Sequence, residues 1–287
     1  MNILITGGAG FVGTNLIKAL LKQGHDITSV DNYNTGLESN HQEGAKYINY
    51  DIRYIDDYSS WGKFDVVYHL AAIARIQPSF NKPEEYFTTN ANGTLKLANY
   101  CVKNNIPIIY AGSSSHHAGK LTNPYTFSKD IGEEILQLFE NVYKLKSTIA
   151  RFYNVYGPYQ LKEGGYTTLI GAWEKQIEEG KPLVIYGDGK KRRDFTHVED
   201  IVEALILILE KQKWGYIFEL GRNKNHSVKE IATMFGKEII YEDDKPGEAF
   251  VTLCEDRLAK EILNWNPKHN IEDYIKKYLD GKQPDIF

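Results

Sequence analysis

The chain has 287 residues, enough for one large or two modest domains with a sizeable core. Its formal net charge of -4 and pI near 6.1 argue against a nucleic-acid-binding protein. No apolar run reaches the length of a membrane span, and the N-terminus lacks the basic region and cleavage site of a signal peptide. Cys101 and Cys254 lie far apart in a chain without a secretory signal, so we expect free buried thiols and a cytoplasmic protein.

A glycine-rich turn follows the first predicted strand, residues 1–6. The run Gly7-Gly8-Ala9-Gly10-Phe11-Val12-Gly13 leads directly into a segment with apolar residues at helical spacing. Glycines at these spacings allow a tight turn, close approach of a pyrophosphate to the backbone, and close packing of helix on strand. The helix N-terminus would add amide donors and the positive end of its dipole. The order of strand, glycine turn and helix therefore predicts a dinucleotide site.

An acidic residue ends the second predicted strand, residues 26–30. Asp31 lies about twenty residues beyond the glycine turn, where a carboxylate would accept from both ribose hydroxyls of an adenosine. A 2'-phosphate would be repelled there, and no arginine follows in Asn32-Tyr33-Asn34, so NAD is favoured over NADP. Asp51, after a strand at 46–50, either faces the adenine or is a turn aspartate.

Strands and helices continue to alternate. A strand at 64–70 leads into His69-Leu70-Ala71-Ala72, whose small residues would let a cofactor lie against the backbone, with His69 expected in the core. A long helix is predicted over 83–104, and Asn90 within it can bond to a neighbouring strand. With a further strand at 148–152, the pattern predicts an α/β fold, a Rossmann-like doubly wound parallel sheet.

The candidate catalytic residues lie between residues 106 and 129. A strand at 106–111 precedes a serine triplet, Ser113 to Ser115, and a helix that carries Tyr125 and Lys129. Four residues apart on a helix, the two side chains share a face, so we expect the ammonium beside the phenol, favouring the phenolate. A serine hydroxyl at the strand end would complete a trio around a substrate hydroxyl.

The organisation changes after residue 158, where the predicted elements become shorter. Four consecutive cations at 190–193 form either a solvated loop or a clamp for a second pyrophosphate. The run Lys245-Pro-Gly-Glu248 offers a second possible phosphate and ribose contact. We expect a smaller C-terminal α/β substrate-binding domain beside the NAD-binding domain. The NAD-binding domain would contain residues 1–158 and 190–213, and the smaller domain residues 159–189 and 214–287.

Motifs extend over nearly the whole chain. They are Thr-Gly-Gly-Ala-Gly-Phe-Val-Gly from Thr6, Asp31-Asn32, Asp51-Ile52, His69-Leu-Ala-Ala, Asn90-Ala-Asn-Gly-Thr94, the serine triplet, Tyr125-x-x-x-Lys129, Arg151-Phe-Tyr-Asn-Val-Tyr-Gly-Pro158, Tyr186-Gly-Asp-Gly189, Arg193-Asp-Phe-Thr-His-Val198 and Leu263-Asn-Trp265. With these motifs the chain resembles the extended short-chain dehydrogenases/reductases that act on nucleotide sugars. This group includes UDP-glucose 4-epimerases, UDP-glucuronate 4-epimerases and dTDP-glucose 4,6-dehydratases.

The resemblance implies roles for single residues. Tyr125 would be the general base, Lys129 its electrostatic partner and a ribose contact, and Ser114 the hydroxyl that orients the sugar O4, chosen over Ser115 by counting back from Gly119. Implied cofactor contacts are Gly7, Gly10, Phe11, Val12, Gly13, Asp31, Asn32, Asp51, Ile52, Leu70, Ala71, Ala72, Asn90, Tyr125, Lys129, Phe152 and Tyr153. Implied substrate contacts are Ser114, Ser115, Asn154, Tyr186, Arg193, Lys245 and Glu248. The resemblance also implies a homodimer through helices at 83–104 and 125–143.

The chain departs from this family at the serine loop, which is short and carries His117-Ala118 before Gly119. The positions where dehydratases hold an acid pair are Ser115 and His116, of which only the histidine could replace a carboxylate. A metal role for His116 and His117 is not expected. We therefore predict an NAD-dependent 4-epimerase of a nucleotide sugar, for which the resemblance implies a UDP-linked hexose. Two alternatives remain: a nucleotide-sugar 4,6-dehydratase and a non-catalytic NAD-binding sensor or scaffold.

Overall fold

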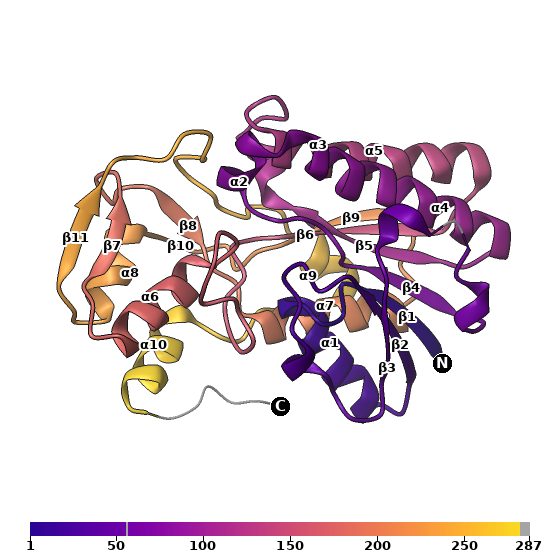
Figure 1. Cartoon of the computed structure of the whole chain (residues 1–287), viewed down its shortest axis with the longest axis horizontal. Helices are drawn as coiled ribbons and strands as arrows, with labels where there is room; N and C mark the ends of the chain where they lie inside the picture. Colours follow the sequence, from indigo (N-terminus) through magenta and orange to yellow (C-terminus); the bar gives the residue numbers. More distant parts are fainter. Residues whose placement is uncertain (56, 282–287) are drawn as a thin grey trace.

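The centre of the molecule is a parallel sheet that runs through the larger part of the chain. The structure is a computed structural model that describes residues 1–55 and 57–281, and within them the sheet has seven strands in the order β3-β2-β1-β4-β5-β6-β9 (Figure 1). Every neighbouring pair is parallel. The strands are β1 Asn2–Thr6, β2 Asp26–Asp31, β3 Lys46–Asn49, β4 Val66–His69, β5 Ile108–Ser113, β6 Ser147–Phe152 and β9 Tyr216–Leu220. All strand ends that precede a predicted site residue therefore meet at one edge.

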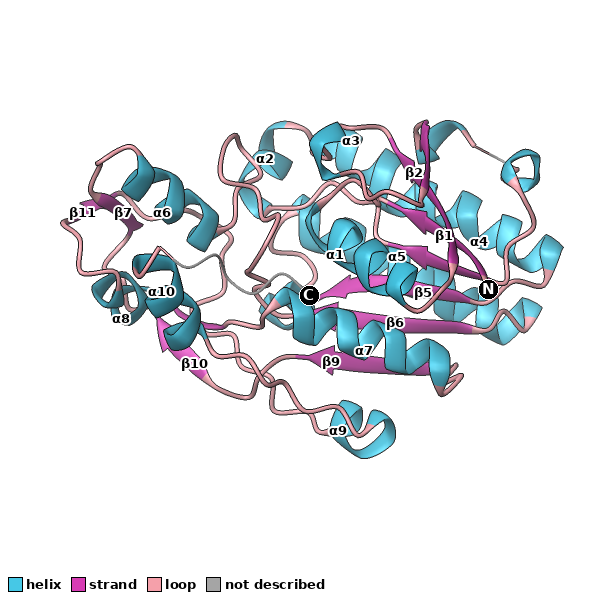
Figure 2. Cartoon of the chain, turned by 90° about the horizontal axis from the view of Figure 1, so that it is seen from below, coloured by secondary structure: helices cyan, strands magenta, loops and turns pink. Residues whose placement is uncertain are grey.

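Helices cover both faces of this sheet. In Figures 1 and 2, α1 (Phe11–Lys22) and α7 (Val198–Glu210) lie on one face, and α4 (Gly93–Asn104) and α5 (Pro124–Tyr143) lie on the other. Each face has its own apolar core. Because both faces are covered, β1 is apolar at successive positions, and Ile3, Leu4 and Ile5 are fully buried. The predicted doubly wound α/β architecture is confirmed.

The long helix predicted over 83–104 is interrupted. It consists of α3 (Pro83–Tyr86), a π-helical turn (Phe87–Asn92) and α4. A π-helical turn inserts an extra residue into the helical ladder and commonly occurs at functional sites. Asn90 lies in this turn, which directs its side chain toward the loop that follows β4.

A smaller unit lies beside the carboxyl edge of the sheet (Figure 1). It contains two short two-stranded sheets and three helices around a core with Trp173, Phe235 and Tyr274. Its elements are α6 Leu169–Glu178, β7 Leu183–Tyr186, β8 Arg192–Asp194, β10 Asn225–Ser227, α8 Val228–Met234, β11 Ile239–Glu242 and α10 Ile271–Leu279. The strand β7 pairs with β11 in parallel, and β8 pairs with β10 antiparallel.

The division between the two units differs from the sequence-based expectation. The segment 214–287 was expected in the smaller domain, yet β9 pairs with β6 as the last strand of the large sheet. Its Phe218 and Leu220 are fully buried there, which accounts for the placement. After β10 and β11 the chain returns again, since α9 (Leu258–Leu263) packs against β9 and α7. Conversely β8, within the expected returning segment 190–213, belongs to a small sheet; residues 282–287 lie outside the described residues.

Two smaller expectations can be compared with the structure. Cys101 and Cys254 are buried free thiols, as predicted. Among the helices formed by residues 1–55 and 57–281, none is both long and apolar enough to cross a bilayer.

Candidate functional site

The glycine turn between β1 and α1 has the sterically closed form expected of a phosphate cradle. Gly7 has a φ of +76°, and a Cβ there would lie 2.7 Å from the Ala71 nitrogen. A Cβ on Gly13 would lie 2.2 Å from the Gly7 carbonyl oxygen, so the helix packs directly on the turn. At Gly10, the N-cap of α1, a Cβ would meet only the Gly7 oxygen at 3.3 Å. The protein alone does not require glycine at position 10, which leaves room for a ligand against the backbone; Phe11 and Val12 begin the helix beside it.

Asp31, at the end of β2, is oriented by the same turn. Its Oδ2 accepts from the Ala9 amide at 3.0 Å and its Oδ1 from the Tyr33 amide at 2.8 Å. Burial raises the pKa of Asp31, and these two amide bonds partly offset the rise. Each oxygen keeps a further lone pair, and a Cβ on Gly36 would come within 3.0 Å of both of them. The cradle and this carboxylate fit an adenosine ribose and pyrophosphate.

Asp51, for which the sequence left an adenine contact or a turn aspartate open, is bound by two neighbouring side chains. Arg53 binds Asp51 through two nitrogens, at 3.0 and 2.7 Å, and Asn32 donates to Asp51 at 2.9 Å. Although burial alone would raise it, these hydrogen bonds hold the pKa of Asp51 below its ordinary value. The neighbouring Ile52 is buried against Gly93 of α4. Asp51 is thus half of an ion pair at the edge of the candidate site, and its proposed adenine contact would be shared with Arg53.

The loop after β4 lies against the glycine turn. The Leu70 amide donates to the Thr6 carbonyl at 3.1 Å, and the Ala71 amide to the Thr6 hydroxyl at 3.3 Å. His69 bridges two threonines, with Nδ1 2.7 Å from the Thr6 hydroxyl and Nε2 2.9 Å from the Thr94 hydroxyl. Burial lowers the pKa of His69 to about 3, so it is a neutral core residue, as expected. Leu70, Ala71 and the next residue, Ala72, remain partly accessible at the sheet edge.

Asn90, expected among the cofactor contacts, requires a correction. Its side chain donates to the Ile73 carbonyl and to the Ser128 hydroxyl, both at 3.0 Å, and accepts from the Ile73 amide at 2.8 Å. The residue is only 1 % exposed. Because its polar atoms are engaged within the protein, Asn90 fastens the loop after β4 to α5 and is not available to a cofactor.

The serine that meets the tyrosine is Ser113. The Tyr125 hydroxyl donates to Ser113 Oγ at 3.2 Å, and Ser115 approaches the same oxygen with its amide at 3.2 Å and its hydroxyl at 2.9 Å. Ser113 is the last residue of β5, whereas Ser114 begins a short 3-10 helix, Ser114–Ala118, and is 8 % exposed. The serine bonded to Tyr125 is thus one residue before the expected Ser114. Counting back from Gly119 leads to Ser114, whereas the register of β5 against β6 places Ser113 at the strand end.

Lys129 lies four residues after Tyr125 in α5 and contacts the neighbouring strand β5. Its ammonium donates to the Ala111 carbonyl at 2.6 Å and lies 4.1 Å from the centre of the Tyr110 ring. Burial lowers the pKa of Lys129 to about 7, against the opposing charges of Glu133 and Asp130. The pKa of Tyr125 is raised, chiefly by burial, and the Ser113 hydrogen bond and the Arg75 charge oppose this rise. The charge of Arg75 thus opposes the rise in the pKa of Tyr125, and the effect of Lys129 on the phenol stays a prediction.

Arg75 is a functional candidate that the sequence analysis missed. It precedes α2 (Ile76–Asn81) with φ +83° and ψ 138°, a region that residues other than glycine rarely enter and that costs about 1–3 kcal/mol. The buried hydroxyl of Tyr86 donates to the carbonyls of Ala74 and Arg75, both at 2.9 Å, and holds this conformation. The Arg75 Nε donates to the Tyr166 carbonyl at 3.1 Å. The only available signal was a lone cation in the loop after a strand end.

Behind the serine loop lies a buried charge network. Arg151 on β6 binds Glu133 of α5 at 2.6 Å and Glu219 of β9 at 2.8 Å. Burial would lower the pKa of Arg151, but the hydrogen bonds with both carboxylates raise it. His117 also lies 3.0 Å from Glu219. This network ties three adjacent elements together beneath the candidate site.

His116 reaches an acidic partner that its sequence neighbours do not reveal. Its Nδ1 lies 3.0 Å from Asp130 of α5, and the other Asp130 oxygen is buried without a hydrogen-bond partner in the described structure. The positions that follow the tyrosine's serine, Ser114 and Ser115, hold no carboxylate. The acid pair of a dehydratase is therefore absent from this loop, whether counted from Ser113 or from Ser114.

In the described part of the chain, two side-chain groups have atoms close enough to surround a metal ion: His116, Asp130 and Glu133, and His197, Glu199 and His269. In the first group, Glu133 already forms an ion pair with Arg151, so a metal cation placed there would be repelled by the arginine. In the second, hydrogen bonds with Asp200 and Glu199 raise the pKa of His269 to about 9, so the imidazole is itself the cation. Neither group is assigned to a metal.

The segment after β6 was expected to contact both cofactor and substrate. Phe152 ends β6 and is partly accessible, but Tyr153 is 3 % exposed and packs where Gly221 leaves room for its ring. Asn154, expected at a substrate phosphate, donates its amide to the Asp194 carbonyl at 3.0 Å and to the Thr252 hydroxyl at 2.9 Å. Asn154 therefore joins the large sheet to the smaller unit, and its expected phosphate contact stays a prediction.

The expected nucleotide contacts gather on the smaller unit. Arg193 donates to Glu248 at 3.1 Å and to the Ala249 carbonyl at 2.7 Å. The Lys245 ammonium lies 3.3 Å from the centre of the Tyr186 ring. A surface pocket of about 700 Å³ adjoins this pair and is lined by Tyr186, Tyr241, Glu242, Asp243 and Lys245. All four predicted contacts, Tyr186, Arg193, Lys245 and Glu248, are thus brought near one another.

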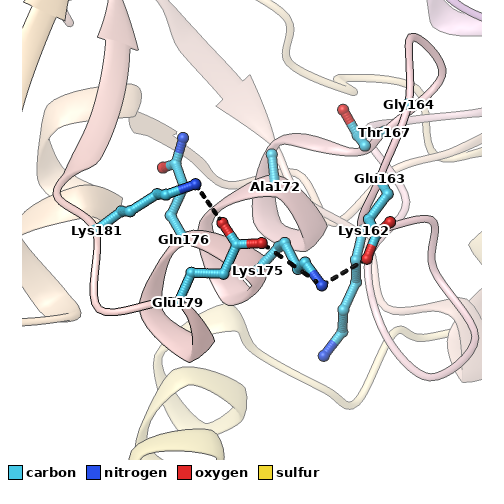
Figure 3. A pocket seen from close by; sticks show the side chains of 9 residues that line it. All are labelled: Lys162, Glu163, Gly164, Thr167, Ala172, Lys175, Gln176, Glu179 and Lys181. Carbon is cyan, nitrogen blue, oxygen red and sulfur yellow. Dashed lines mark ion pairs between the residues drawn. The ribbon is translucent and has the colours of Figure 1, made fainter.

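A second pocket, of about 450 Å³, lies over α6 and the loop before it (Figure 3). Its charges pair with one another, since Lys175 contacts Glu163 and Glu179, and Lys181 contacts Glu179. No residue predicted from the sequence lines it. The candidate site is therefore the carboxyl edge of the large sheet together with the facing surface of the smaller unit.

Comparison with known proteins finds a matching family, related sequences and similar solved structures. The model of the NAD dependent epimerase/dehydratase family matches residues 3–221. A UDP-N-acetyl-alpha-D-glucosaminuronate decarboxylase from Bacillus cytotoxicus is 34% identical over 250 residues, covering 80% of this chain and 77% of the relative. The structure of a UDP-glucose 4-epimerase from Thermotoga maritima with UDP-glucose is similar, with a TM-score of 0.91, 28% identity and 98% of each chain covered. So is a UDP-glucuronic acid 4-epimerase from Bacillus cereus in complex with UDP-glucuronic acid and NAD, with a TM-score of 0.88, 27% identity and 98% of each chain covered.

Proposed function

Because this chain belongs to the NAD-dependent epimerase/dehydratase family, we propose that it inverts carbon 4 of a UDP-linked hexose. The enzyme is an isomerase, and its reaction passes through a transient 4-keto sugar. The observation that carries the proposal is the Tyr125 hydroxyl at 3.2 Å from Ser113, at the sheet edge where the glycine turn also lies. Solved relatives with this fold act on C4 of UDP-sugars, and two of them hold UDP-glucose and UDP-glucuronic acid.

The cofactor is NAD. The glycine turn would hold its pyrophosphate at the N-terminus of α1, and Asp31 would accept from the adenosine ribose. The chemistry that NAD supplies is reversible hydride transfer at C4. Since the hydride returns in the same turnover, no external oxidant or reductant is consumed.

The side chains of this protein have the remaining tasks. Ser113 would hold the sugar O4 next to Tyr125, which takes the O4 proton when the alcohol becomes a ketone and returns it when the ketone is reduced. After the keto sugar turns over, reduction on its other face gives the epimer. We assign the orienting role to Ser113 and not Ser114, because Ser113 is the hydroxyl bonded to Tyr125. Lys129 would meet the cofactor ribose from its buried position beside Tyr110.

The nucleotide would bind to the smaller unit. Arg193 and Lys245 supply positive charge for the diphosphate, while Tyr186 and Glu248 would lie near the base and ribose. Support comes from their proximity to one another and from the pocket beside Tyr186. The larger unit would then hold the cofactor and the smaller one the nucleotide, with the hexose between them.

The proposal is tested with Tyr125→Phe. Purified wild-type protein, incubated with UDP-glucose, UDP-galactose and their uronic acids, should yield the C4 epimers by proton NMR without change of mass. The variant should lose at least about 1,000-fold in kcat while it still binds NAD. Tyr143→Phe, at the exposed end of α5, serves as the matched control and should keep wild-type activity. Wild-type turnover in Tyr125→Phe would refute the mechanism.

Other outcomes of the same assay separate the alternatives. Loss of water would identify a 4,6-dehydratase, and loss of carbon dioxide would match the reaction named for the Bacillus cytotoxicus relative. Tight NAD binding with every nucleotide sugar unchanged would identify a sensor or scaffold. Any of these results would replace the proposed epimerisation.

We further propose that the protein is a homodimer. Large apolar side chains are exposed along α5, at Leu138, Val142 and Tyr143, and on the adjacent α4 at Leu95. Exposed apolar side chains grouped on neighbouring helices are typical of an interface. Light scattering of the wild-type protein should give a mass of twice the 32.8 kDa chain. The Leu138→Glu variant should give the mass of a single chain.

A further inference from the structure

The serine loop, residues 113–119, is joined to α5 by a contact that the proposed mechanism does not use. His116 lies in the 3-10 helix Ser114–Ala118, and its Nδ1 is 3.0 Å from Asp130 Oδ1. Ser113 is the N-cap of this 3-10 helix, and Tyr125 lies on α5 together with Asp130. Two bonds therefore connect the same loop to the same helix, and the second of them has no role in the chemistry proposed so far.

Asp130 depends on His116 because burial leaves the carboxylate few other partners. Its side chain is 4% exposed, and among residues 1–55 and 57–281 only His116 hydrogen-bonds to it. Its second oxygen, Oδ2, is buried without a partner in the same part of the chain. A carboxylate can only accept, so the imidazole donates from Nδ1. Because a buried carboxylate is costly unless it is hydrogen-bonded or paired, releasing His116 would leave Asp130 uncompensated.

The charges next to this pair are already engaged elsewhere. An oxygen of Glu133 also lies within 4.8 Å of both groups, but Glu133 binds Arg151 at 2.6 Å. Lys129, the residue before Asp130, donates its ammonium to a β5 carbonyl at 2.6 Å. In the described part of the chain, His116 is thus the only basic side chain in contact with Asp130.

The 3-10 helix that carries His116 also fixes the hydroxyl that meets Tyr125. Ser113 Oγ accepts from the Ser115 amide at 3.2 Å, and the Ser115 hydroxyl lies 2.9 Å from it. The Tyr125 hydroxyl donates to the same oxygen, so both lone pairs of Ser113 are occupied. The proton of Ser113 is left for the Ser115 hydroxyl or, in the proposed function, for the sugar O4. Its direction therefore depends on where the 3-10 helix lies.

Other contacts of this stretch of chain differ from that of His116. Lys120 contacts Glu134 of α5, but the two side chains are 42% and 57% exposed. Exposed ion pairs contribute little, because water screens both charges. His117 contacts Glu219 of β9, an element that does not carry Tyr125. The contact of His116 is therefore the buried one that joins the serine loop to the helix of the catalytic tyrosine.

We propose that His116, held by Asp130, is a positioning residue that keeps the Ser113 hydroxyl against Tyr125 during C4 epimerisation. The inference rests on the proposed function and adds a residue that acts through Ser113 without touching the sugar. Loss of the contact lets the 3-10 helix shift, and the Ser113 proton then points away from O4. A displacement of about 1 Å can cost about 100-fold in rate, so a partial shift should cost about tenfold.

The test is a double-mutant cycle measured with the active UDP-sugar. His116→Ala should lower kcat about tenfold and leave KM and NAD binding unchanged. In the Ser113→Ala background the same change should lower kcat less than about twofold, because the residue through which His116 acts is gone. His116→Asn, whose amide can take the place of Nδ1, should recover most of the loss. Lys120→Gln is the matched control and should keep wild-type kcat.

A second measurement needs no turnover. Hydrogen exchange of the ligand-free protein is followed by mass spectrometry on peptides that cover residues 113–119. Exchange should be at least about fivefold faster in His116→Ala than in the wild type, because the Ser115 amide loses its partner when the 3-10 helix shifts. Lys120→Gln should exchange at the wild-type rate.

Three results would overturn the inference. If His116→Ala lowers kcat by the same factor with and without Ser113, the histidine acts independently of that serine. If His116→Ala keeps wild-type kcat, the contact has no part in catalysis. Equal losses in His116→Ala and Lys120→Gln would identify general attachment of the loop. Failure of the wild-type protein to invert C4 would instead refute the proposed function, while the exchange rates would still decide whether His116 holds the serine loop.

Discussion

The two halves of the candidate site are built from different parts of the polypeptide. The dinucleotide half uses backbone: the glycine turn, the amides of Ala9 and Tyr33 that orient Asp31, and the loop held by Thr6. The sugar half uses charged side chains from distant segments, such as Arg193 and Glu248. The dinucleotide half is a surface of fixed shape, and the sugar half is an arrangement of charged side chains.

This difference teaches how each half awaits its ligand. In the dinucleotide half the steric cradle exists in the folded chain, so little has to move when a pyrophosphate arrives. In the sugar half, Glu248 binds Arg193, and Lys191 binds Asp244. These pairs must rearrange when an anionic substrate enters. We expect shape-changing substitutions to damage the first half and charge-changing ones the second.

The largest effect should come from filling the cradle. In Gly13→Val the Cβ would lie 2.2 Å from the Gly7 oxygen and 2.7 Å from Gly8, so backbone must move, at a cost of about 3 kcal/mol. Calorimetry should show a fall in Tm of roughly 10 °C and no retained NAD. Gly10→Ala is the matched control, because its Cβ is 3.3 Å from the nearest atom; it should keep its Tm and lose only NAD affinity. Equal melting losses in both variants would contradict the cradle.

In the sugar half, the serine assignment predicts the next effect. Ser113→Ala removes the hydroxyl bonded to Tyr125 and should lower kcat about 100-fold with little change in KM. Ser114→Ala changes the neighbouring residue and should lower kcat less than about threefold. Initial rates by coupled assay with the active UDP-sugar decide between them. The reverse ranking would restore the assignment obtained by counting from Gly119.

These two predictions show which parts of the site can be derived from sequence. Gly7, Gly13 and Asp31 lie at the turn and the strand end where the sequence placed them, because strand, turn and helix follow one another along the chain. Ser113, the serine bonded to Tyr125, was not singled out, because the position was counted from Gly119 and not from the strand. The contacts of Arg75 with Tyr86 and of Asn154 with Thr252 join segments far apart in sequence, which no local pattern encodes.

The stability of the dinucleotide half should depend on pH through His69. His69, beneath the glycine turn, has a folded pKa of about 3 against 6.5 in the unfolded chain. The unfolded state alone takes up the proton between these values, so stability is lost as the pH falls below 6.5, by about 2 kcal/mol at pH 5. Chemical denaturation from pH 6.5 to 5 should show this slope, and His69→Asn should reduce it; above pH 6.5 the raised pKa of His269, about 9, gives a slope of the opposite sign. Part of the slope should persist in that variant, because the pKa of His197 is lowered to about 4.

The smallest effect concerns the nucleotide. Arg193→Gln should weaken UDP binding about tenfold, and the loss should shrink as salt is added, because the contact is electrostatic. Lys190→Gln lies in the same run of cations, but its side chain is 75% exposed and pairs with Asp188. It should change the affinity less than twofold. An equal loss in both variants would identify general attraction in place of a defined contact.

The path of the chain through β9 bears on whether the larger unit can exist alone. The polypeptide leaves the sheet after β6, builds part of the smaller unit, returns with α7 and β9, and leaves again. A gene truncated after Pro158 would therefore encode six strands with β6 as a bare edge and the surface under α7 uncovered. Exposed edges of this kind recruit other chains. We expect such a fragment to aggregate upon expression, so excising a minimal dinucleotide-binding module from this protein requires a substitute for its last strand.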